Sequence, residues 1–225
     1  MTHATVWTLV QRSFSPEGER VPRVAESRLP ALPSSEGQKD RYRRILRAAA
    51  EHGAAHGLDG IQMVDVAKDA GVAVATMYRY FPSKTILFTQ VLRGLVERLN
   101  DDVPALRPGA DPIDAVADVL VGTGRELMRR PRLAHAMLHS NNATVAGDEP
   151  SLAVDSAFGD VILKAAGIAH PTDHDLRLVR LIEQTWYGVL TSALNGHIDA
   201  AGAEGDIRLA CRLLLGDLGR GVAGD

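Results

Sequence analysis

The stretch GVAVATMYRYFPSK, residues 71–84, carries the clearest structural signals in the sequence. Gly71 ends a short helix expected over residues 62–70, because glycine readily adopts the positive φ found just after helices. A second short helix is expected over 74–80, and Pro82 stops it. Two helices joined by a three-residue turn that contains glycine are typical of a helix-turn-helix, whose second helix enters the major groove of DNA.

Aromatic side chains gather in the same stretch. The whole chain holds only 4 Phe, 4 Tyr and 2 Trp, yet Tyr78, Tyr80 and Phe81 lie within four residues of one another. Half or more of all protein–DNA hydrogen bonds go to phosphate and sugar. We therefore expect Tyr78, Arg79, Tyr80 and Lys84 to contact phosphate, and Phe81 to turn inward. Plain core packing is the alternative for the tyrosine pair.

The remainder of the chain has a helical pattern. Apolar residues recur at helical spacing, glycine, proline and capping residues punctuate the runs, and no alternating strand pattern or internal repeat is present. We predict an all-α fold in which an N-terminal three-helix head precedes a C-terminal helical domain. The nine expected helices span about residues 40–56, 62–70, 74–80, 84–100, 112–129, 131–139, 151–166, 172–195 and 206–218, with a loop over 140–150.

Charge and proline divide the chain into three parts. Residues 39–93 hold 9 Lys and Arg against 5 Asp and Glu, whereas residues 94–225 hold 12 against 19. This asymmetry indicates that the first of these segments meets a polyanion and the second does something else. Residues 1–38 contain four prolines among Ser, Gly and Glu, which predicts a flexible extension. The expected domains are 1–38, a DNA-binding domain over 39–92 and a second domain over 93–225.

Composition indicates the compartment in which the protein works. Cys211 is the only cysteine, so an intramolecular disulfide is impossible and a reducing compartment is indicated. No apolar run reaches the roughly 18 residues that a membrane span needs. The first residues lack the basic start and the long apolar core of a signal peptide. We expect a cytoplasmic protein without a membrane partner.

The run from Ile45 to Leu87 resembles the DNA-binding head of the tetracycline-repressor (TetR) family of bacterial regulators. Two departures stand out. Ala73 stands where the family usually has a capping Ser, a loss worth about 1 kcal/mol. Ala75 stands where Gly is common, and its methyl group can touch a thymine methyl. The matching residues are Ile45, Ala48, Ala49, Val66-Ala67, Gly71-Val72 and the run TMYRYFPSK over 76–84.

This resemblance implies a double-stranded DNA operator as partner and assigns contacts to it. The implied DNA-binding residues of the helix-turn-helix and the following turn are Gln62, Val64, Val74, Ala75, Thr76, Tyr78, Arg79, Tyr80 and Lys84. Four basic residues just ahead of Ile45, around the start of the first expected helix, look like an arm that precedes the helix and follows DNA, with a solvated helix start as the alternative. They are Lys39, Arg41, Arg43 and Arg44.

For residues 93–225 the resemblance implies an effector-binding and dimerising body. The protein would be a ligand-responsive repressor, a homodimer that leaves a palindromic operator when a small molecule binds. The last two expected helices are broadly apolar, which favours burial on more than one side. Ordinary intrachain core is the alternative. The expected dimer-interface residues are Leu176, Val179, Ile182, Ile207, Ala210, Leu214 and Leu218.

Three further segments are similar, more weakly, to the actinobacterial subgroup that represses cholesterol and lipid catabolism. They are VAESRLP over 24–30, RRPRLAHAML over 129–138 and DIRLACRLLLGDLG over 206–219. That likeness implies a hydrophobic effector, a steroid or an acyl-CoA thioester. Arg129, Arg130 and Arg132 are candidates for a CoA phosphate, with an exposed helix end as the alternative. The candidate pocket residues, each with ordinary core as its alternative, are Leu120, Leu127, Met137, Phe158, Trp186 and Leu190.

The sequence gives little support to metal binding, cofactor binding or catalysis. Six of the 8 His form three His-x3-His pairs, a spacing that can place two metal ligands on one helix face. His135 and His139 are the best of these, and a metal-responsive regulator is the runner-up function. We nevertheless predict no metal and no cofactor, because no HExxH motif, second cysteine or glycine-rich phosphate loop is present. No catalytic constellation appears, so we expect no enzyme; an all-helical enzyme is the least favoured alternative.

Overall fold

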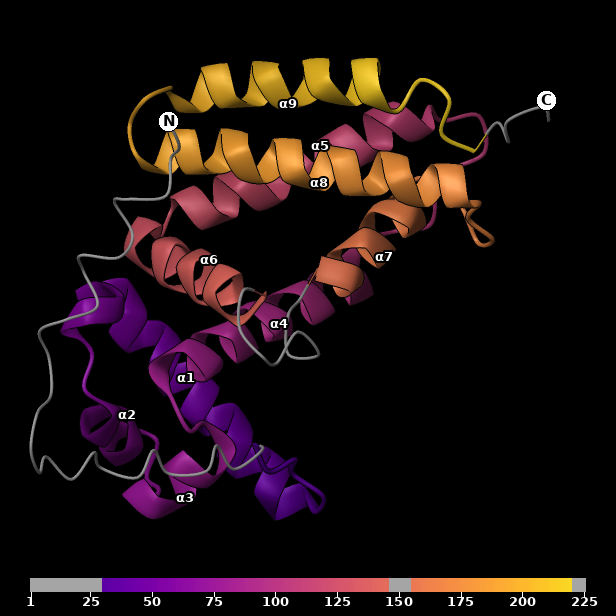
Figure 1. The fold of residues 1–225 in the computed structure, drawn as a ribbon. Helices are drawn as coiled ribbons and strands as arrows, with labels where there is room; N and C mark the ends of the chain where they lie inside the picture. Colours follow the sequence, from indigo (N-terminus) through magenta and orange to yellow (C-terminus); the bar gives the residue numbers. More distant parts are fainter. Residues whose placement is uncertain (1–29, 146–154, 220–225) are drawn as a thin grey trace, which may run out of the picture.

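The computed structural model describes residues 30–145 and 155–219, and over these residues it is all-α, with no strand among them (Figure 1). The predicted fold class is confirmed, and the described parts contain the nine helices expected. They are α1 (Glu36–Gly60), α2 (Met63–Asp69), α3 (Val74–Tyr80), α4 (Lys84–Asp102), α5 (Pro112–Met128), α6 (Pro131–Val145), α7 (Asp155–Ala165), α8 (Asp173–Leu194) and α9 (Ala200–Leu214).

Helices α1 to α3 form the head, at the bottom of Figure 1. Gly71 has a φ of 64°, and this left-handed conformation closes the turn between α2 and α3. The backbone amides of Gly71 and Val72 donate to the carbonyls of Lys68 and Ala67, both at 3.0 Å. The helix-turn-helix geometry expected from the sequence is therefore present. The fully buried side chains of the head are Ile45, Ala49, Ile61, Val66, Ala67, Met77, Tyr80 and Phe81.

Helix α4 connects the head to the body. Ser83 caps it, because its Oγ accepts a hydrogen bond from the backbone amide of Ile86 at 3.1 Å. The helix packs against α1 in the head and against α6 and α7 in the body. The predicted domain boundary at residues 92 and 93 thus falls inside one continuous helix. Helix α4 is therefore shared by the head and the body.

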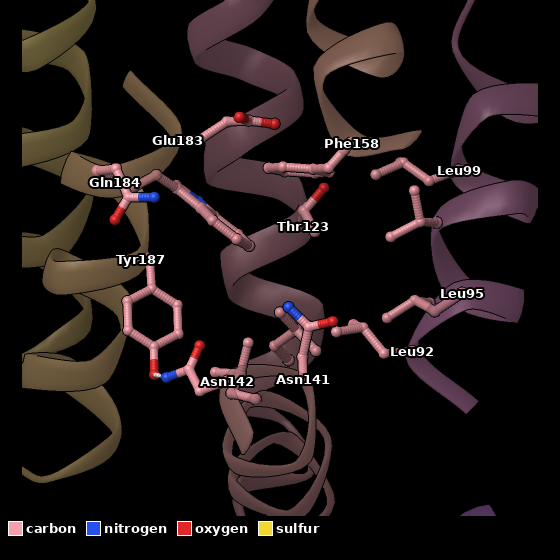
Figure 2. Close-up of a pocket in the computed structure, with 14 residues that line it drawn as sticks. Leu92, Leu95, Leu99, Thr123, Asn141, Asn142, Phe158, Glu183, Gln184 and Tyr187 are labelled. Carbon is pink, nitrogen blue, oxygen red and sulfur yellow. Dashed lines mark hydrogen bonds between the residues drawn. The ribbon is translucent and has the colours of Figure 1, made fainter. Parts of the chain in front are cut away.

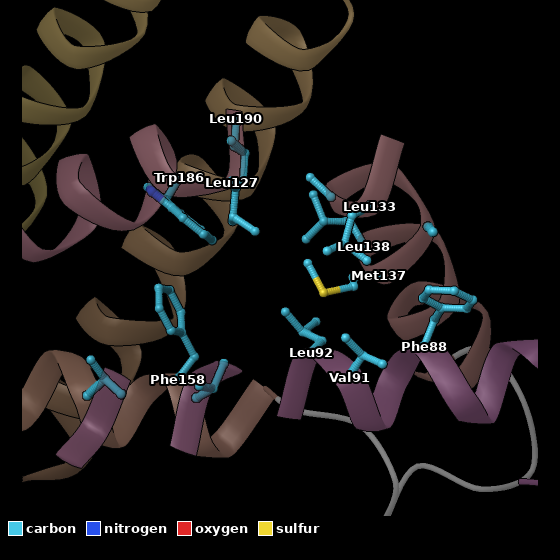
Figure 3. Close-up of a cluster of buried hydrophobic side chains, with 14 of the residues drawn as sticks. Phe88, Val91, Leu92, Leu127, Leu133, Met137, Leu138, Phe158, Trp186 and Leu190 are labelled. Carbon is cyan, nitrogen blue, oxygen red and sulfur yellow. The ribbon is translucent and has the colours of Figure 1, made fainter. Parts of the chain in front are cut away.

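In the body, α5 packs against each of α6, α7, α8 and α9. Helices α8 and α9 lie side by side at the top of Figure 1, and α5 packs against both. The indole Nε1 of Trp186 donates to the backbone carbonyl of Leu120 at 2.9 Å, which ties α8 to α5. Figure 3 shows the core that continues from this point toward the head, with Phe158 and Trp186 on one side and Phe88, Leu133 and Met137 on the other.

A buried carboxylate holds the start of α8. Asp175 and Thr172 form a capping box, and the second carboxylate oxygen of Asp175 accepts from the backbone amide of Gly219 at 2.8 Å. Burial by itself raises the pKa of Asp175, but the hydrogen bonds from Gly219 and Thr172 outweigh it and lower this pKa below its ordinary value. The carboxylate is therefore ionised, and it joins the first turn of α8 to the segment that follows α9.

Several helix boundaries differ from those expected. Helix α1 begins at Glu36 because Ser35 caps it, so the basic residues expected ahead of the helix lie within it. Helix α6 continues to Val145, through part of the expected 140–150 loop, and Thr144 Oγ1 hydrogen-bonds Thr89 Oγ1 at 3.0 Å. Asp199 caps α9, which runs over Ala200–Leu214 rather than 206–218. The predicted extension up to residue 29, and residues 146–154, lie outside the described parts.

At Gly53, α1 of the head packs closely against α4 and α6. A Cβ at this position would lie 2.7 Å from Phe88 Cε1 of α4 and 2.9 Å from Leu133 Cδ1 of α6. Those distances are shorter than any normal carbon–carbon contact, and both neighbours are buried. Beside it, Arg132 Nη1 donates to the carbonyl of Ala55 at 2.6 Å, and Arg130 lies 3.5 Å from Glu51. Close packing and two arginines therefore hold α1 against the body.

We expect Gly53→Ala to destabilise the protein by about 1–3 kcal/mol, because overpacking forces its neighbours off their rotamers. The measurement is urea unfolding followed by circular dichroism. Gly122→Ala is the matched control: Gly122 is also helical, and nothing lies within 4 Å of a Cβ there. That control gains up to about 1 kcal/mol from helix propensity. Equal stability of the two variants would contradict the close packing at Gly53.

Candidate DNA-binding face and ligand pocket

The outer face of α3 carries two stripes of exposed side chains. Val74 and Tyr78 form one stripe, and Ala75 and Arg79 form the other, since residues four apart share a helix face. Val74 is 37% exposed and Tyr78 is 44% exposed. Thr76 is half-buried. The first turn of the helix therefore offers methyl groups, and its last turn offers a hydroxyl and a guanidinium.

Tyr80 departs from the expected role. Its residue is 1% exposed, and its ring meets the Tyr42 ring edge-on with centroids 5.7 Å apart. This burial contradicts the prediction that Tyr80 contacts phosphate. The Tyr80 hydroxyl instead accepts from Arg79 Nη2 at 3.1 Å, and the Arg79 guanidinium lies 5.0 Å from the ring centroid. Tyr80 thus orients the cation that precedes it, and the core-packing alternative holds for Tyr80 but not for Tyr78.

The basic residues of α1 divide by their partners. Lys39 pairs with Glu36 at 2.8 Å, and Arg44 pairs with Asp40 at 3.2 Å while donating to the carbonyl of Ala70 at 2.7 Å. Arg44 therefore ties α1 to the end of α2. The prediction of an arm ahead of the first helix is wrong, because all four residues lie in α1. Contacts of Lys39, Arg41, Arg43 and Arg44 with DNA remain predictions.

At the edges of the helix-turn-helix, three further predicted residues are accessible. Gln62 is exposed at the N-cap position of α2, and Val64 is exposed in its first turn. Lys84 is half-buried at the start of α4. Their contacts with DNA remain predictions as well.

A cavity of about 420 Å³ lies in the body between α4, α5, α6, α7 and α8 (Figure 2). Its lining is mostly apolar. The lining residues are Leu92, Leu95, Val96, Leu99, Thr123, Leu127, Leu138, Asn141, Asn142, Phe158, Glu183, Gln184, Trp186 and Tyr187. The predicted pocket residues Leu127, Phe158 and Trp186 are among them. The prediction was wrong for Leu120, Met137 and Leu190, which are buried in the core and do not line the cavity.

Polar groups gather at one side of this cavity. The side-chain amide of Asn142 donates to the Tyr187 hydroxyl, as drawn in Figure 2, and Asn141 and Gln184 lie nearby. Glu183 is the one charged residue in the lining that the described chain provides, and no basic residue accompanies it there. The cavity therefore combines a large apolar wall with neutral hydrogen-bonding groups and a single carboxylate.

The lining residues that sequence reasoning missed include four from α4. Leu92, Leu95, Val96 and Leu99 follow the three- and four-residue spacing of one helix face, so the signal was present, but it equally fits core packing. Arg130 and Arg132 do not line the cavity, because they contact α1. Arg129 pairs with Glu126 at 2.7 Å on the surface. A role for these arginines toward a CoA phosphate stays a prediction.

Apolar side chains are also exposed on α8 and α9. Four leucines are exposed there, and Leu213, at 73%, is the most accessible of them. They are Leu176, Leu181, Leu209 and Leu213. Of the expected interface residues, Leu176 is exposed and Ala210 and Leu214 are half-buried. Val179, Ile182, Ile207 and Leu218 are buried within the chain itself, which favours ordinary intrachain core for these four; the dimer interface remains a prediction.

The metal-responsive alternative would need a cluster of metal ligands, and none lies among the described residues. His135 and His139 are both exposed on α6, and no group of three or more potential ligands occurs among residues 30–145 and 155–219. His52 instead hydrogen-bonds Asp69 at 2.7 Å. In the same ranges, none of the helices combines the length and the apolarity needed to cross a membrane.

Comparisons with known proteins cover both halves of the chain. The family described as bacterial regulatory proteins, tetR family, matches residues 45–91, and the tetracyclin repressor-like C-terminal domain matches residues 109–214. The HTH-type transcriptional repressor KstR of Rhodococcus jostii is 32% identical over 189 residues, which are 82% of this chain and 87% of that protein. KstR of Mycobacterium tuberculosis is also 32% identical, over 201 residues, or 86% of this chain and 87% of that protein.

A solved structure agrees with these matches. The crystal structure of a TetR transcriptional regulator from Rhodococcus sp. RHA1 is 46% identical in sequence, with a TM-score of 0.72. The alignment covers 79% of this chain and 98% of that one. The likeness thus extends over the head and the body together.

Proposed function

Since the chain belongs to the tetracycline-repressor family of DNA-binding transcriptional regulators, we propose that it is a homodimeric repressor that an apolar small molecule releases from its operator. The relatives named KstR agree with the weaker resemblance to actinobacterial repressors of sterol and lipid breakdown. The observation that carries the proposal is the outer face of α3, where exposed apolar, hydroxyl and guanidinium groups project from a helix-turn-helix.

Two copies of the head would read the two halves of a near-palindrome. Recognition helices of such dimers lie about 34–36 Å apart, one turn of DNA. The exposed leucines of α8 and α9 support a dimer formed by these two helices from each subunit. Because the heads must match the operator spacing, any change in their separation weakens DNA binding.

The cavity in the body is the proposed effector site. Its volume of about 420 Å³ lies within the usual range for small-molecule sites. It suits an acyl chain or a fused-ring skeleton, whereas the nucleotide of a CoA thioester would have to stay outside. The neutral amides and the Tyr187 hydroxyl suit a ketone, hydroxyl or ester oxygen. The lining that the described residues provide contains no basic side chain, which disfavours a ligand whose buried end is a carboxylate, because that charge would be buried without a partner.

Helix α4 would transmit the signal. Leu92, Leu95 and Leu99 line the cavity, while Phe88, one turn earlier, lies against α1 at Gly53. An effector that prefers a different position of α4 would favour heads whose spacing no longer fits the operator. DNA and effector must then weaken each other's binding by the same factor.

The test is a titration of the protein against the DNA directly upstream of its own gene, by fluorescence anisotropy at two salt concentrations. We expect tight binding that falls steeply with salt and that random DNA competes poorly. Progesterone, a neutral steroid ketone, and lauroyl-CoA then serve as effector probes, with anionic deoxycholate as the comparison. Release by progesterone or by lauroyl-CoA, whose acyl end is uncharged, but not by deoxycholate is expected. Binding no tighter than to random DNA, for operators selected from a random pool as well, would overturn the proposal.

A matched variant separates the two sites. Gln184 is exposed at the cavity lining, so Gln184→Trp should fill the cavity without disturbing the core. This variant is expected to bind DNA as the unmodified protein does and to ignore the effector probes. An unchanged effector response in Gln184→Trp would place the effector elsewhere.

A further inference from the structure

The first turn of the recognition helix is unusual for a surface that meets DNA. Ala73, Val74 and Ala75 are consecutive and exposed, and their side chains hold neither a hydrogen-bond donor nor an acceptor. The N-cap Ala73 makes no side-chain hydrogen bond, so the helix lacks the stabilisation that Ser, Thr, Asp or Asn would supply there. Valine is also a poorer helix former than most residues. The first turn of α3 is thus less stable than it would be with other residues. Such a loss of local stability is expected at functional sites.

Apolar groups in the major groove have one main partner. The C5-methyl group of thymine is the apolar feature that distinguishes base pairs there, while the remaining pattern consists of hydrogen-bond donors and acceptors. The Val74 and Ala75 methyl groups project from the same outer face as Tyr78 and Arg79, four residues later on each stripe. If Tyr78 and Arg79 in the last turn of α3 contact phosphates, the first turn of α3 lies nearer the base edges in the major groove.

We propose that Val74 and Ala75 determine operator specificity by packing against thymine C5-methyl groups, so that base reading by α3 rests on apolar contact more than on hydrogen bonds. This inference rests on the proposed function, because it needs α3 in the major groove. Half-buried Thr76 is the one side chain in the first half of α3 that can hydrogen-bond a base. Each half-site therefore contains at least one thymine that faces this turn.

The experiment replaces thymine by deoxyuridine, which lacks only the C5-methyl group. An operator is first selected from random duplex DNA with the full-length protein, and then prepared with thymine or with deoxyuridine in its half-sites. Loss of one buried methyl group weakens binding about fourfold, and a symmetric operator loses it twice. We expect the deoxyuridine operator to bind at least about tenfold more weakly by fluorescence anisotropy. Deoxyuridine placed only in the flanking DNA is the control and should have no effect.

Variants locate the contact on the protein. Val74→Ala and Ala75→Gly should weaken binding to the thymine operator and have little further effect on the deoxyuridine operator, because the partner methyl group is already absent. Three results would overturn the inference: equal affinity for both operators, fully additive effects of variant and base change, or selected half-sites without thymine. Failure to select any sequence would instead count against the proposed function.

Discussion

Leu213→Glu is expected to convert the protein from a dimer to a monomer and to weaken operator binding at least about a hundredfold. Leu213 is 73% exposed on α9, and Leu209 lies one turn earlier on the same helix face. A dimer that covers this surface would bury two unpaired carboxylates in the variant, which costs far more than the leucine contacts supply. A monomer also loses the effective concentration by which the first bound head promotes the second, a factor of about 10²–10⁴.

Light scattering coupled to size exclusion gives the mass, and anisotropy gives the affinity for a two-half-site operator. Ala105→Glu is the control, since it adds the same charge at an exposed position in the loop between α4 and α5. Val179 and Ile182 would be poor choices, because they are buried within the chain and their replacement would unfold it. A Leu213→Glu protein that stays dimeric would move the interface away from this surface.

The head was predictable because its signals are local. Gly71, Pro82 and Ser83 each act on the backbone next to them, and the structure places the turn, the stop and the cap at these residues. The spacing within α3 also held the information on Tyr80. Residues 78 and 80 lie about 200° apart around a helix, so both cannot face DNA, and Tyr80 lies on the buried side with Met77.

The body was less predictable because its partners are distant in the sequence. Helix α8 has apolar residues on two faces, and composition alone does not tell which face meets the core and which meets solvent or a second subunit. Val179 and Leu176 are equivalent in the sequence pattern, yet one is buried and the other exposed. The cavity is harder still, since it exists only where five helices fail to fill the space between them, and its leucines look like any others.

Arg79→Ala is expected to weaken operator binding about thirtyfold. One exposed charged contact to phosphate is worth about 1 kcal/mol, and a dimer loses two. The slope of log affinity against log salt should also fall in magnitude by about 2, because each head releases one counterion fewer. Thermal stability should fall by no more than about 1–3 kcal/mol, because the buried Tyr80 hydroxyl loses the hydrogen bond from Arg79 while alanine favours the helix.

Two further variants separate the charge of Arg79 from its orientation. Arg79→Lys keeps a charge but loses the planar group that lies over the Tyr80 ring, so an intermediate affinity with an unchanged salt slope is expected. Tyr80→Phe keeps the ring and removes only the hydroxyl that accepts from Arg79, so the loss should be smaller still. If Tyr80→Phe instead weakened binding as much as Arg79→Ala and lowered the salt slope, the Tyr80 hydroxyl would be a phosphate ligand after all. That outcome would mean that α3 rearranges on DNA, because in this structure the hydroxyl is buried against its own helix.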